Sequence, residues 1–303
     1  MVYMLSYHAA LGDQLCFTAA VHAFKVAHPF DLVAVDVTFP EIYEGNPDVH
    51  SCGSGVGHFS CDRQYIVGLP VFASHRNMTL QEASADQLRV EIEDPTPRMY
   101  LRDDEKRPWM EKANDLNGGP LVGLAPDARW DSRCYPLHGW AQVVAYLREL
   151  YDARVVGLGK YSRDCPAYCI DWAGTTVREL AAAVSVCDLI LATDNGVAHM
   201  AAAVGTPAVV LYGPVLGKYR AGELTIPVEG VGCKGCYHEL MDVPASEFRF
   251  SCPKGKGYEC MKSISVEKIT DACAKAIDTM KDGLHGDSCD GDASELEAPG
   301  KSS

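Results

Sequence analysis

Short apolar runs alternate with longer stretches of helical periodicity along most of this chain. Apolar runs of strand length occur at residues 2–8, 31–37, 120–127, 153–159, 188–194 and 207–214. Stretches with apolar residues at helical spacing occur at residues 11–28, 79–88, 138–151, 175–187, 195–205 and 265–281. Strands that alternate with helices in this way predict an α/β fold, in which helices cover parallel sheets.

A Pro-rich, charged stretch at residues 93–108 interrupts this alternation. Such composition is typical of a segment between domains. We therefore expect an N-terminal domain over residues 1–110 and a C-terminal domain over residues 111–282, the latter with a Cys-rich insertion at residues 231–262. Residues 283–303 are polar and acidic, which predicts a disordered tail.

Composition is that of a soluble globular protein. Apolar residues make up 47% of the 303 residues and charged residues 22%, and no apolar run approaches the roughly 20 residues that a bilayer crossing needs. The N-terminus lacks the basic region and apolar stretch of an export signal. We therefore expect a cytoplasmic protein without a membrane span. The formal net charge of −14 argues against nucleic acid as a partner.

The most informative segment runs from residue 188 to residue 214. A predicted strand brings Asp194 to its carboxyl end, and a helix begins at once. Open α/β sheets bind anions at this position, because free backbone amides and the helix dipole converge there. Gly196 would let a phosphate approach the backbone, and His199 lies one turn into the helix. The alternative is a plain strand–turn–helix in which Asp194 and Asn195 act only as caps.

This segment resembles the signature of glycosyltransferase family nine. That signature has an Asp, a Ser or Thr, a Gly, a His, a helix of small residues, then Gly-Thr-Pro and a strand that ends in Phe or Tyr, Gly and Pro. The matching positions are Asp194, Gly196, His199, Gly205, Thr206, Pro207, Tyr212, Gly213 and Pro214. Asn195 replaces the usual hydroxyl residue, so the expected phosphate contacts are those of the backbone.

Two further stretches match the same family. Residues 11–29 resemble its N-terminal loop and helix, which implies that Asp13 faces the cleft between the domains. Residues 125–147 resemble its phosphate-contacting loop, with Arg133 where Lys is common. An Arg neutralises a diphosphate with a fork of donors rather than a point charge. The resemblance implies a GT-B fold, in which two Rossmann-like domains with parallel sheets face each other across a cleft.

One feature of the family is missing. Its members often hold the donor ribose with a Glu after the strand that corresponds to residues 153–159. The turn here offers Lys160, Tyr161, Ser162 and Asp164 instead, so the resemblance does not fix the nucleotide.

The resemblance implies an inverting glycosyltransferase that needs no metal or other cofactor for catalysis. The donor would be a nucleotide-diphosphate sugar, with ADP-heptose as the family's expectation, and the acceptor a glycan, a lipid-linked saccharide or a protein. Asp13 would be the catalytic base that takes the proton of the acceptor hydroxyl. Taken alone, Asp13 is equally consistent with a helix N-cap. The donor-binding residues that the resemblance implies are Gly12, Arg133, Asp194, Asn195, Gly196 and His199.

Two other functions stay open from the sequence. One is a GT-B enzyme with another reaction, such as sugar-nucleotide epimerisation, and the other is a nucleotide-sugar binding protein without turnover. Assembly into a homo-oligomer is open as well. A heavily phosphorylated acceptor is the less attractive choice, because it needs a basic patch that the acidic composition does not indicate.

The insertion holds four cysteines with the spacing Cys233-x2-Cys236-x15-Cys252-x7-Cys260. Cys-x2-Cys is a common metal-binding pair, and four thiolates suit tetrahedral zinc or iron. The second pair is spaced more widely than usual, so reduced thiols that steady a loop are the alternative. A metal bound by all four would be structural, because no coordination position stays open.

Overall fold

The computed structural model describes residues 1–55, 60–68, 75–159, 165 and 169–286, and the side chains up to residue 280. The acidic tail from residue 287 onward lies outside the described residues, as do Lys160, Tyr161, Ser162 and Asp164. The sequence places the start of the tail at residue 283, but the last helix continues to Gly286.

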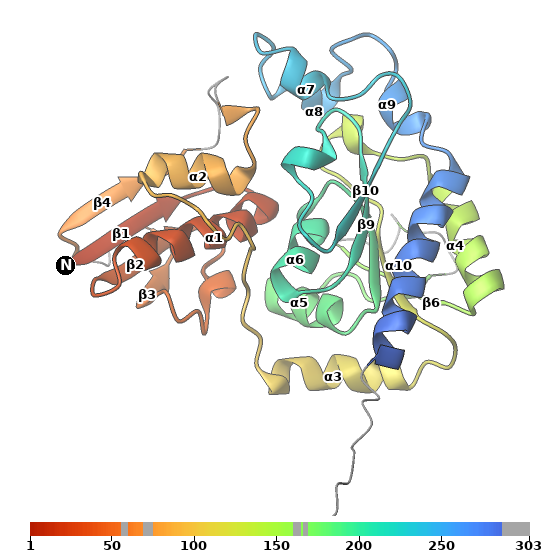
Figure 1. Cartoon of the computed structure of the whole chain (residues 1–303), viewed down its shortest axis with the longest axis horizontal. Helices are drawn as coiled ribbons and strands as arrows, with labels where there is room; N and C mark the ends of the chain where they lie inside the picture. The colour runs from red at the N-terminus through yellow and green to blue at the C-terminus, as the bar shows by residue number, and fades with distance from the viewer. Residues whose placement is uncertain (56–59, 69–74, 160–164, 166–168, 287–303) are drawn as a thin grey trace, which may run out of the picture.

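Two parallel sheets form two lobes that lie side by side (Figure 1). The first sheet has the strand order β3-β2-β1-β4 and the second the order β10-β9-β8-β5-β6-β7. The elements of the first lobe are β1 (Val2–Tyr7), α1 (Leu11–Ala27), β2 (Leu32–Val37), β3 (Ser51–Gly53), β4 (Arg63–Ile66) and α2 (Leu80–Leu88). The predicted pattern of parallel strands and covering helices is confirmed.

The second lobe contains the remaining helices and strands. They are α3 (Asp103–Asn114), β5 (Leu121–Ala125), α4 (Leu137–Tyr151), β6 (Arg154–Gly157), β7 (Ile170–Asp171), α5 (Val177–Ser185), β8 (Leu189–Thr193), α6 (Gly196–Val204), β9 (Ala208–Tyr212), β10 (Thr225–Glu229), α7 (Cys236–Glu239), α8 (Glu247–Phe250), α9 (Glu259–Lys262) and α10 (Val266–Gly286). None of the helices in the described ranges has both the length and the apolar character that a bilayer crossing requires.

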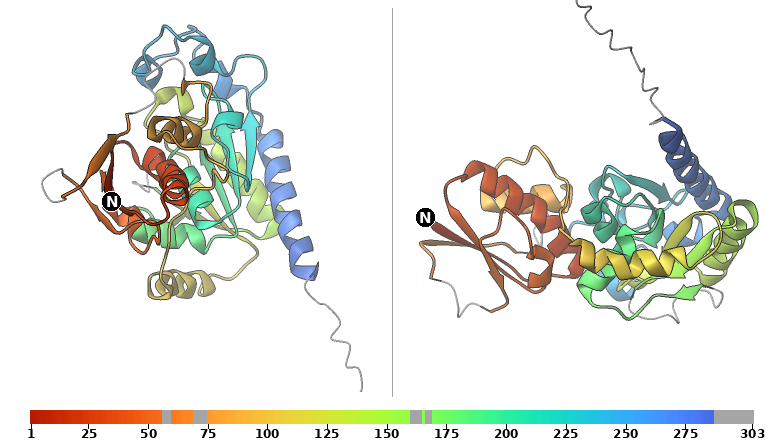
Figure 2. Two further views of the ribbon diagram at one scale, coloured as in Figure 1. Left: turned by 60° about the vertical axis from the view of Figure 1, so that its left-hand side comes forward. Right: turned by 90° about the horizontal axis from the view of Figure 1, so that it is seen from below.

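The two faces of the second sheet are covered differently. Helices α4 and α10 pack on the face that is turned away from the first lobe (Figure 2). Helices α5 and α6 cover the other face, and α6 also packs against α1 of the first lobe. One continuous apolar core therefore runs from the first sheet through the α1–α6 contact into the second sheet. This shared core fixes the starts of α1 and α6 next to each other.

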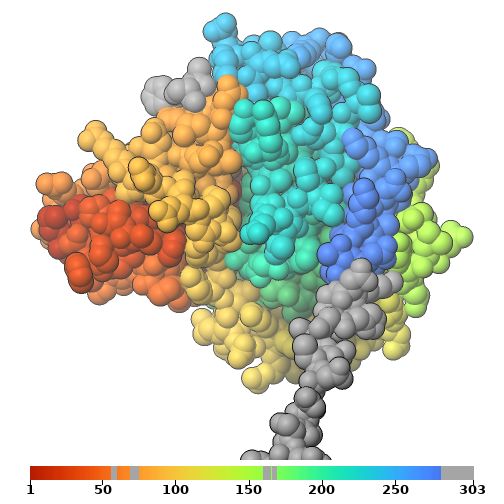
Figure 3. All heavy atoms as spheres, viewed as in Figure 1, coloured from red at the N-terminus to blue at the C-terminus, as the bar shows by residue number. Residues whose placement is uncertain are grey.

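The chain passes from the first lobe to the second in an extended segment before α3. The amide of Arg98 donates to the Thr18 hydroxyl of α1, and the amide of Met99 donates to the Ala203 carbonyl of α6. Position 110, where the sequence places the boundary between domains, lies inside α3. In the space-filling view the two lobes are in contact along their boundary (Figure 3).

Candidate functional site

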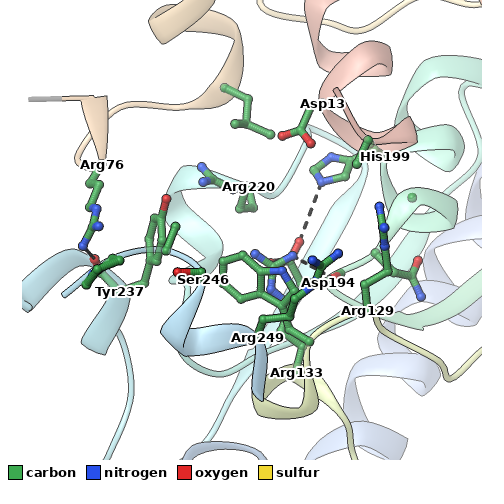
Figure 4. A pocket seen from close by; sticks show the side chains of 18 residues that line it. Asp13, Arg76, Arg129, Arg133, Asp194, His199, Arg220, Tyr237, Ser246 and Arg249 are labelled. Atoms are coloured by element: carbon green, nitrogen blue, oxygen red, sulfur yellow. Dashed lines mark hydrogen bonds and ion pairs between the residues drawn. The ribbon is translucent and has the colours of Figure 1, made fainter. Parts of the chain in front are cut away.

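A pocket of about 600 Å³ lies where the starts of α1 and α6 meet (Figure 4). Its walls come from the first lobe, from the second lobe and from the segment that contains the four cysteines. A volume of this size suits a small-molecule ligand. All seven residues that the sequence indicates for catalysis and donor binding line this pocket: Gly12, Asp13, Arg133, Asp194, Asn195, Gly196 and His199.

Asp194 follows β8 and is almost fully buried, with 3% of its surface exposed. Its carboxylate lies 3.2 Å from Nη1 of Arg133 and 3.7 Å from Nε2 of His199. Burial by itself would raise the pKa of Asp194, but the charge of Arg133 and the contact with His199 outweigh this effect and hold the pKa well below its ordinary value. Asp194 is therefore an ionised, paired carboxylate.

Arg133 is fixed from two sides. Its Nη1 also donates to the carbonyl oxygen of Asp194 at 3.3 Å, and its guanidinium stacks on the ring of Trp130 at 3.9 Å from the centroid. The stacking, the hydrogen bond to the Asp194 carbonyl and the ion pair with the Asp194 carboxylate leave the planar guanidinium little freedom to rotate. Arg133 thus enters the pocket in a preset orientation, with its charge already shared with Asp194.

His199 lies on α6 and faces α1. Its Nδ1 is 3.4 Å from the sulfur of Cys16, on the side opposite Asp194. Burial lowers the pKa of His199, but Cys16 and Asp194 raise it more, to about 10. The imidazole is therefore protonated near neutral pH. A Cβ on Gly12 would come within 2.6 Å of Cδ2 of His199, so this close approach of the two helices requires a glycine at position 12.

Asn195 caps α6. Its Oδ1 accepts hydrogen bonds from the amides of Val197 and Ala198, and its Nδ2 donates to the carbonyls of Ala125 and Asp127. The capping role that the sequence offered as an alternative is therefore confirmed for the side chain of Asn195. An anion at the start of α6 would have to use the backbone amides of Asn195 and Gly196 instead.

Asp13 lies in the first turn of α1, whose N-cap is Ala10, and no side-chain cap bond is present there. The helix-cap alternative for Asp13 is therefore wrong. The side chain is half-buried and faces the pocket. Burial raises the pKa of Asp13, whereas His199, Arg220 and Arg133 act in the opposite direction. A carboxylate with a raised pKa is a stronger base than a carboxylate with an ordinary pKa.

Sequence reasoning missed four further arginines that line the pocket. They are Arg76, Arg129, Arg220 and Arg249, and they come from four separate segments. With Arg133, five arginines surround two carboxylates in a chain whose net charge is −14. The argument from composition against a basic patch was therefore wrong, because the fold concentrates positive charge in this one place. Only the nearness of Arg129 to Arg133 in the sequence gave a local signal.

Arg76 joins the first lobe to the cysteine-containing segment. Its guanidinium donates to the carbonyls of Tyr237, Leu240 and Val243 at 3.4, 2.8 and 2.6 Å, and its own carbonyl contacts Nδ1 of His238. Only 5% of Arg76 is exposed. These bonds hold the segment after β10 against the first lobe, so that Tyr237 and residues 244–246 form one wall of the pocket.

The four cysteines lie near one another in this segment. Burial raises the pKa of Cys236 to about 11, with the neighbouring Cys233 acting in the same direction. Burial also acts on Cys252, but backbone amides of residues 254 and 256–258 outweigh it and lower the pKa of this thiol. Within the described ranges, however, no three His, Cys, Asp or Glu side chains are arranged to hold a metal ion. The zinc or iron site indicated by Cys233, Cys236, Cys252 and Cys260 therefore stays a prediction.

The model of glycosyltransferase family 9 (heptosyltransferase) matches residues 71–219. This range contains the buried Asp194, its partner Arg133 and the start of α6. This stretch, just under half of the chain, thus resembles glycosyltransferase family 9. The lipooligosaccharide heptosyltransferase 2 of Campylobacter jejuni is 25% identical over 174 residues, which are 50% of this chain and 50% of that protein. The match thus spans about half the length of this curated relative.

Solved structures resemble nearly the whole chain in fold. The iron-containing dodecameric glycosyltransferase TibC from enterotoxigenic E. coli H10407 superposes with a TM-score of 0.75 at 17% identity, over 93% of this chain and 79% of that one. A second TibC structure, in complex with ADP-D-β-D-heptose, gives a TM-score of 0.74 at 16% identity, over 92% of this chain and 77% of that one. The E. coli ADP-heptose LPS heptosyltransferase II gives 0.70 at 14% identity, over 93% of this chain and 100% of that one. These likenesses confirm the expected GT-B fold.

Proposed function

We propose that this protein is an inverting glycosyltransferase, whose donor is a nucleotide-diphosphate sugar and most simply ADP-heptose. The observation that carries the proposal is the pocket itself. A carboxylate with a raised pKa, Asp13, faces a set of positive charges around Asp194 from the opposite lobe. The match to the model of family 9 and the ADP-heptose complex of TibC support the choice of donor.

The proposed step forms one bond and breaks another at the anomeric carbon. The carboxylate of Asp13 takes the proton of an acceptor hydroxyl, and the oxygen attacks the anomeric carbon from the face opposite the diphosphate. The bond between the anomeric carbon and the diphosphate oxygen breaks, and its electron pair leaves with the nucleotide. The sugar is transferred with inverted configuration, and Asp13 keeps the proton until it returns it to solvent.

The departing nucleotide diphosphate needs positive charge as the bond breaks. Arg133 is held in place by Asp194 and Trp130, and Arg129 is in the same loop. The amides of Asn195 and Gly196 and the dipole of α6 add to this field. Preset donors cost no reorganisation in the transition state. These groups can supply the charge that a divalent cation supplies in other transferases, which supports transfer without a catalytic metal.

The acceptor is a glycan, a lipid-linked saccharide or a protein side chain that carries a hydroxyl. The acceptor hydroxyl has to reach Asp13, so the acceptor enters from the side of the first lobe and the cysteine-containing segment. A nucleotide-sugar binding protein without turnover would have no use for a half-buried carboxylate with a raised pKa at this position. The geometry therefore favours transfer over binding alone.

The products of a sugar-nucleotide panel test this function. ADP-heptose and the corresponding GDP-, UDP- and dTDP-sugars are incubated with the protein and an extract of bacterial glycans, and the nucleotides are separated by chromatography. Free ADP together with a heptosylated product supports the proposal. An altered sugar nucleotide would show an epimerase, and unchanged donor that nevertheless binds would show a binding protein.

We also propose that the cysteine-containing segment has a structural rather than a catalytic role and that its four cysteines bind zinc or iron. The presence of four cysteines supports this proposal, as does the description of TibC as an iron-containing glycosyltransferase. The sulfur of Cys252, which faces several backbone amides, suits a thiolate. Elemental analysis of untagged protein is the test: one zinc or iron per chain supports the proposal, and fully folded metal-free protein contradicts it.

A further inference from the structure

The side chain of His199 makes polar contacts with both lobes at once. Its Nε2 lies 3.7 Å from the carboxylate of Asp194 in the second lobe, and its Nδ1 lies 3.4 Å from the sulfur of Cys16 on α1 in the first lobe. Only 8% of His199 and 1% of Cys16 are exposed, so water does not readily replace either partner. A protonated imidazole has two N–H donors, and here each donor has its partner in a different lobe.

The ring of His199 lies against the turn of α1 that carries Asp13. Gly12 contacts one edge of the ring, where an added Cβ would come within 2.6 Å of Cδ2, and Cys16 contacts Nδ1. Gly12 and Cys16 are four residues apart and therefore share one face of the helix, and Asp13 belongs to the same turn. In Figure 4 the ring lies between Asp13 and Asp194. His199 is therefore a physical link between the two carboxylates.

The contact with Cys16 selects one orientation of this ring. A half-turn about the Cβ–Cγ bond would exchange Nδ1 with Cδ2 and Nε2 with Cε1. Carbon atoms would then face Cys16 and Asp194, and Nδ1 would lie beside the α-carbon of Gly12, which accepts no hydrogen bond. The observed orientation gives an acceptor to both N–H groups, so the buried ring is held in place by the sulfur on one side and the carboxylate on the other.

A buried thiol that only fills space is the alternative role for Cys16. The neighbours of the sulfur argue against it. Burial raises the pKa of Tyr7, Tyr43 and Tyr212, and the nearby sulfur adds to this effect, so these phenols stay neutral. His199 is thus the charged partner of Cys16 in this cluster. A hydrogen bond from a charged donor is stronger than a neutral one, and it orients the imidazole as well as filling space.

We propose that Cys16 is a positioning residue of the transfer reaction, which fixes the ring of His199 and so keeps Asp194 and the Asp13 turn of α1 in the relative placement that transfer requires. This inference rests on the proposed function, because that function gives the two carboxylates their tasks. Cys16 is not among the described residues that line the pocket, so it acts through His199. A displacement of about 1 Å can cost about a hundredfold in rate, so a contact behind the pocket can control kcat.

Kinetics of three cysteine variants test the role in transfer. Cys16→Ala removes the partner of Nδ1 and should lower kcat about tenfold to a hundredfold, with the donor KM and the ADP affinity within about threefold of wild type. Cys16→Ser keeps an acceptor for Nδ1 and should restore most of kcat. Cys273→Ala is the matched control, because Cys273 is also fully buried but lies on α10. Its truncation should lower stability and leave kcat unchanged.

Spectra of protein with ¹⁵N-labelled histidine report on the ring itself. In wild type both ring nitrogens of His199 should carry protons near neutral pH, with a pKa of about 10. Cys16→Ala should lower this pKa by about one unit or more, and Cys16→Ser by less. His199→Gln identifies the signal. The other titratable groups that face the ring are Asp194 after β8 and Asp13 on α1, and these variants leave both unchanged.

Three results would overturn the inference: wild-type kcat in Cys16→Ala, an unchanged titration of His199 in that variant, or an equal loss of kcat in Cys16→Ala and Cys273→Ala. If Cys16→Ala does not fold, Cys16→Val takes its place, because valine fills a similar space without an acceptor. If wild-type protein transfers no sugar from any donor, the proposed function fails, and the role of Cys16 in transfer fails with it. The spectra report separately on whether Cys16 holds His199.

Discussion

Two carboxylates in one pocket have opposite environments. Asp194 lies between Arg133 and His199, and its pKa is held well below the ordinary range. Asp13 lies within reach of the same charges but contacts none of them at ion-pair distance, and burial raises its pKa. Pairs of groups whose pKa values are pushed apart in this way divide the tasks of charge stabilisation and proton transfer. Asp194 thus organises the positive charge, and Asp13 is free to exchange a proton.

Asp13→Asn should give the largest effect, because the amide keeps the shape of the carboxylate but cannot take a proton. We expect kcat for sugar transfer to fall by about 10²–10⁴, with ADP affinity and the free energy of unfolding nearly unchanged. Single-turnover kinetics and ADP titration measure the two quantities. Retention of wild-type kcat would remove Asp13 from the mechanism.

Asp194→Ala should act on stability rather than on proton transfer. The substitution leaves Arg133 and His199 partly or fully buried without their shared partner, and breaking a buried pair costs about 3–5 kcal/mol. Urea denaturation measures this loss. The double variant Arg133→Met, Asp194→Ala should recover part of it, because no unpaired guanidinium remains. Equal stability of wild type and Asp194→Ala would show that the pair is not coupled.

The helix and strand ends with local signals could be predicted from the sequence. Thr176 and Glu179 form a capping box at the start of α5, and Gly205 ends α6 in the left-handed conformation. The elements without such signals were missed. β3 has only three residues, and β10 is an edge strand that contains Pro227, which only an edge tolerates.

α3 was mistaken for a linker because of Pro108 and its charges. The acidic first turn explains why it is a helix after all: the carboxylate of Glu105 accepts the amide of Arg102 and also pairs with Arg178 of α5. The arginines of the pocket could not be predicted for a different reason. Arg76 and Arg220 are far apart in the sequence and line the same pocket only because of the tertiary fold, so no sequence spacing connects them.

Gly12→Ala should test whether the different environments of Asp13 and Asp194 depend on the close contact of α1 and α6. The added Cβ would lie 2.6 Å from Cδ2 of His199, so the ring or the helix has to move. Such overpacking costs about 1–3 kcal/mol, and kcat should fall as Asp13 shifts. Gly68→Ala is the control, because its Cβ would meet nothing closer than a flexible side chain at 3.7 Å. Equal Tm values for the two variants would contradict the expectation.

The pH dependence of stability should show the smallest effect for a change of one pH unit. The pKa of His199 is raised to about 10 in the folded protein, against about 6.5 in an unfolded chain. Its contribution to stability is therefore fully present below about pH 6.5 and is lost as the pH rises toward 10, because the neutral ring no longer balances Asp194. Urea denaturation at several pH values in this window should show wild-type stability falling more steeply than that of His199→Gln, by less than about 1.4 kcal/mol per pH unit. The same measurement on Cys16→Ser shows how much of the raised pKa of His199 is due to the Cys16 thiol. Parallel curves for wild type and His199→Gln would mean that the imidazole is neutral in the folded protein, and that Arg133 alone keeps Asp194 ionised.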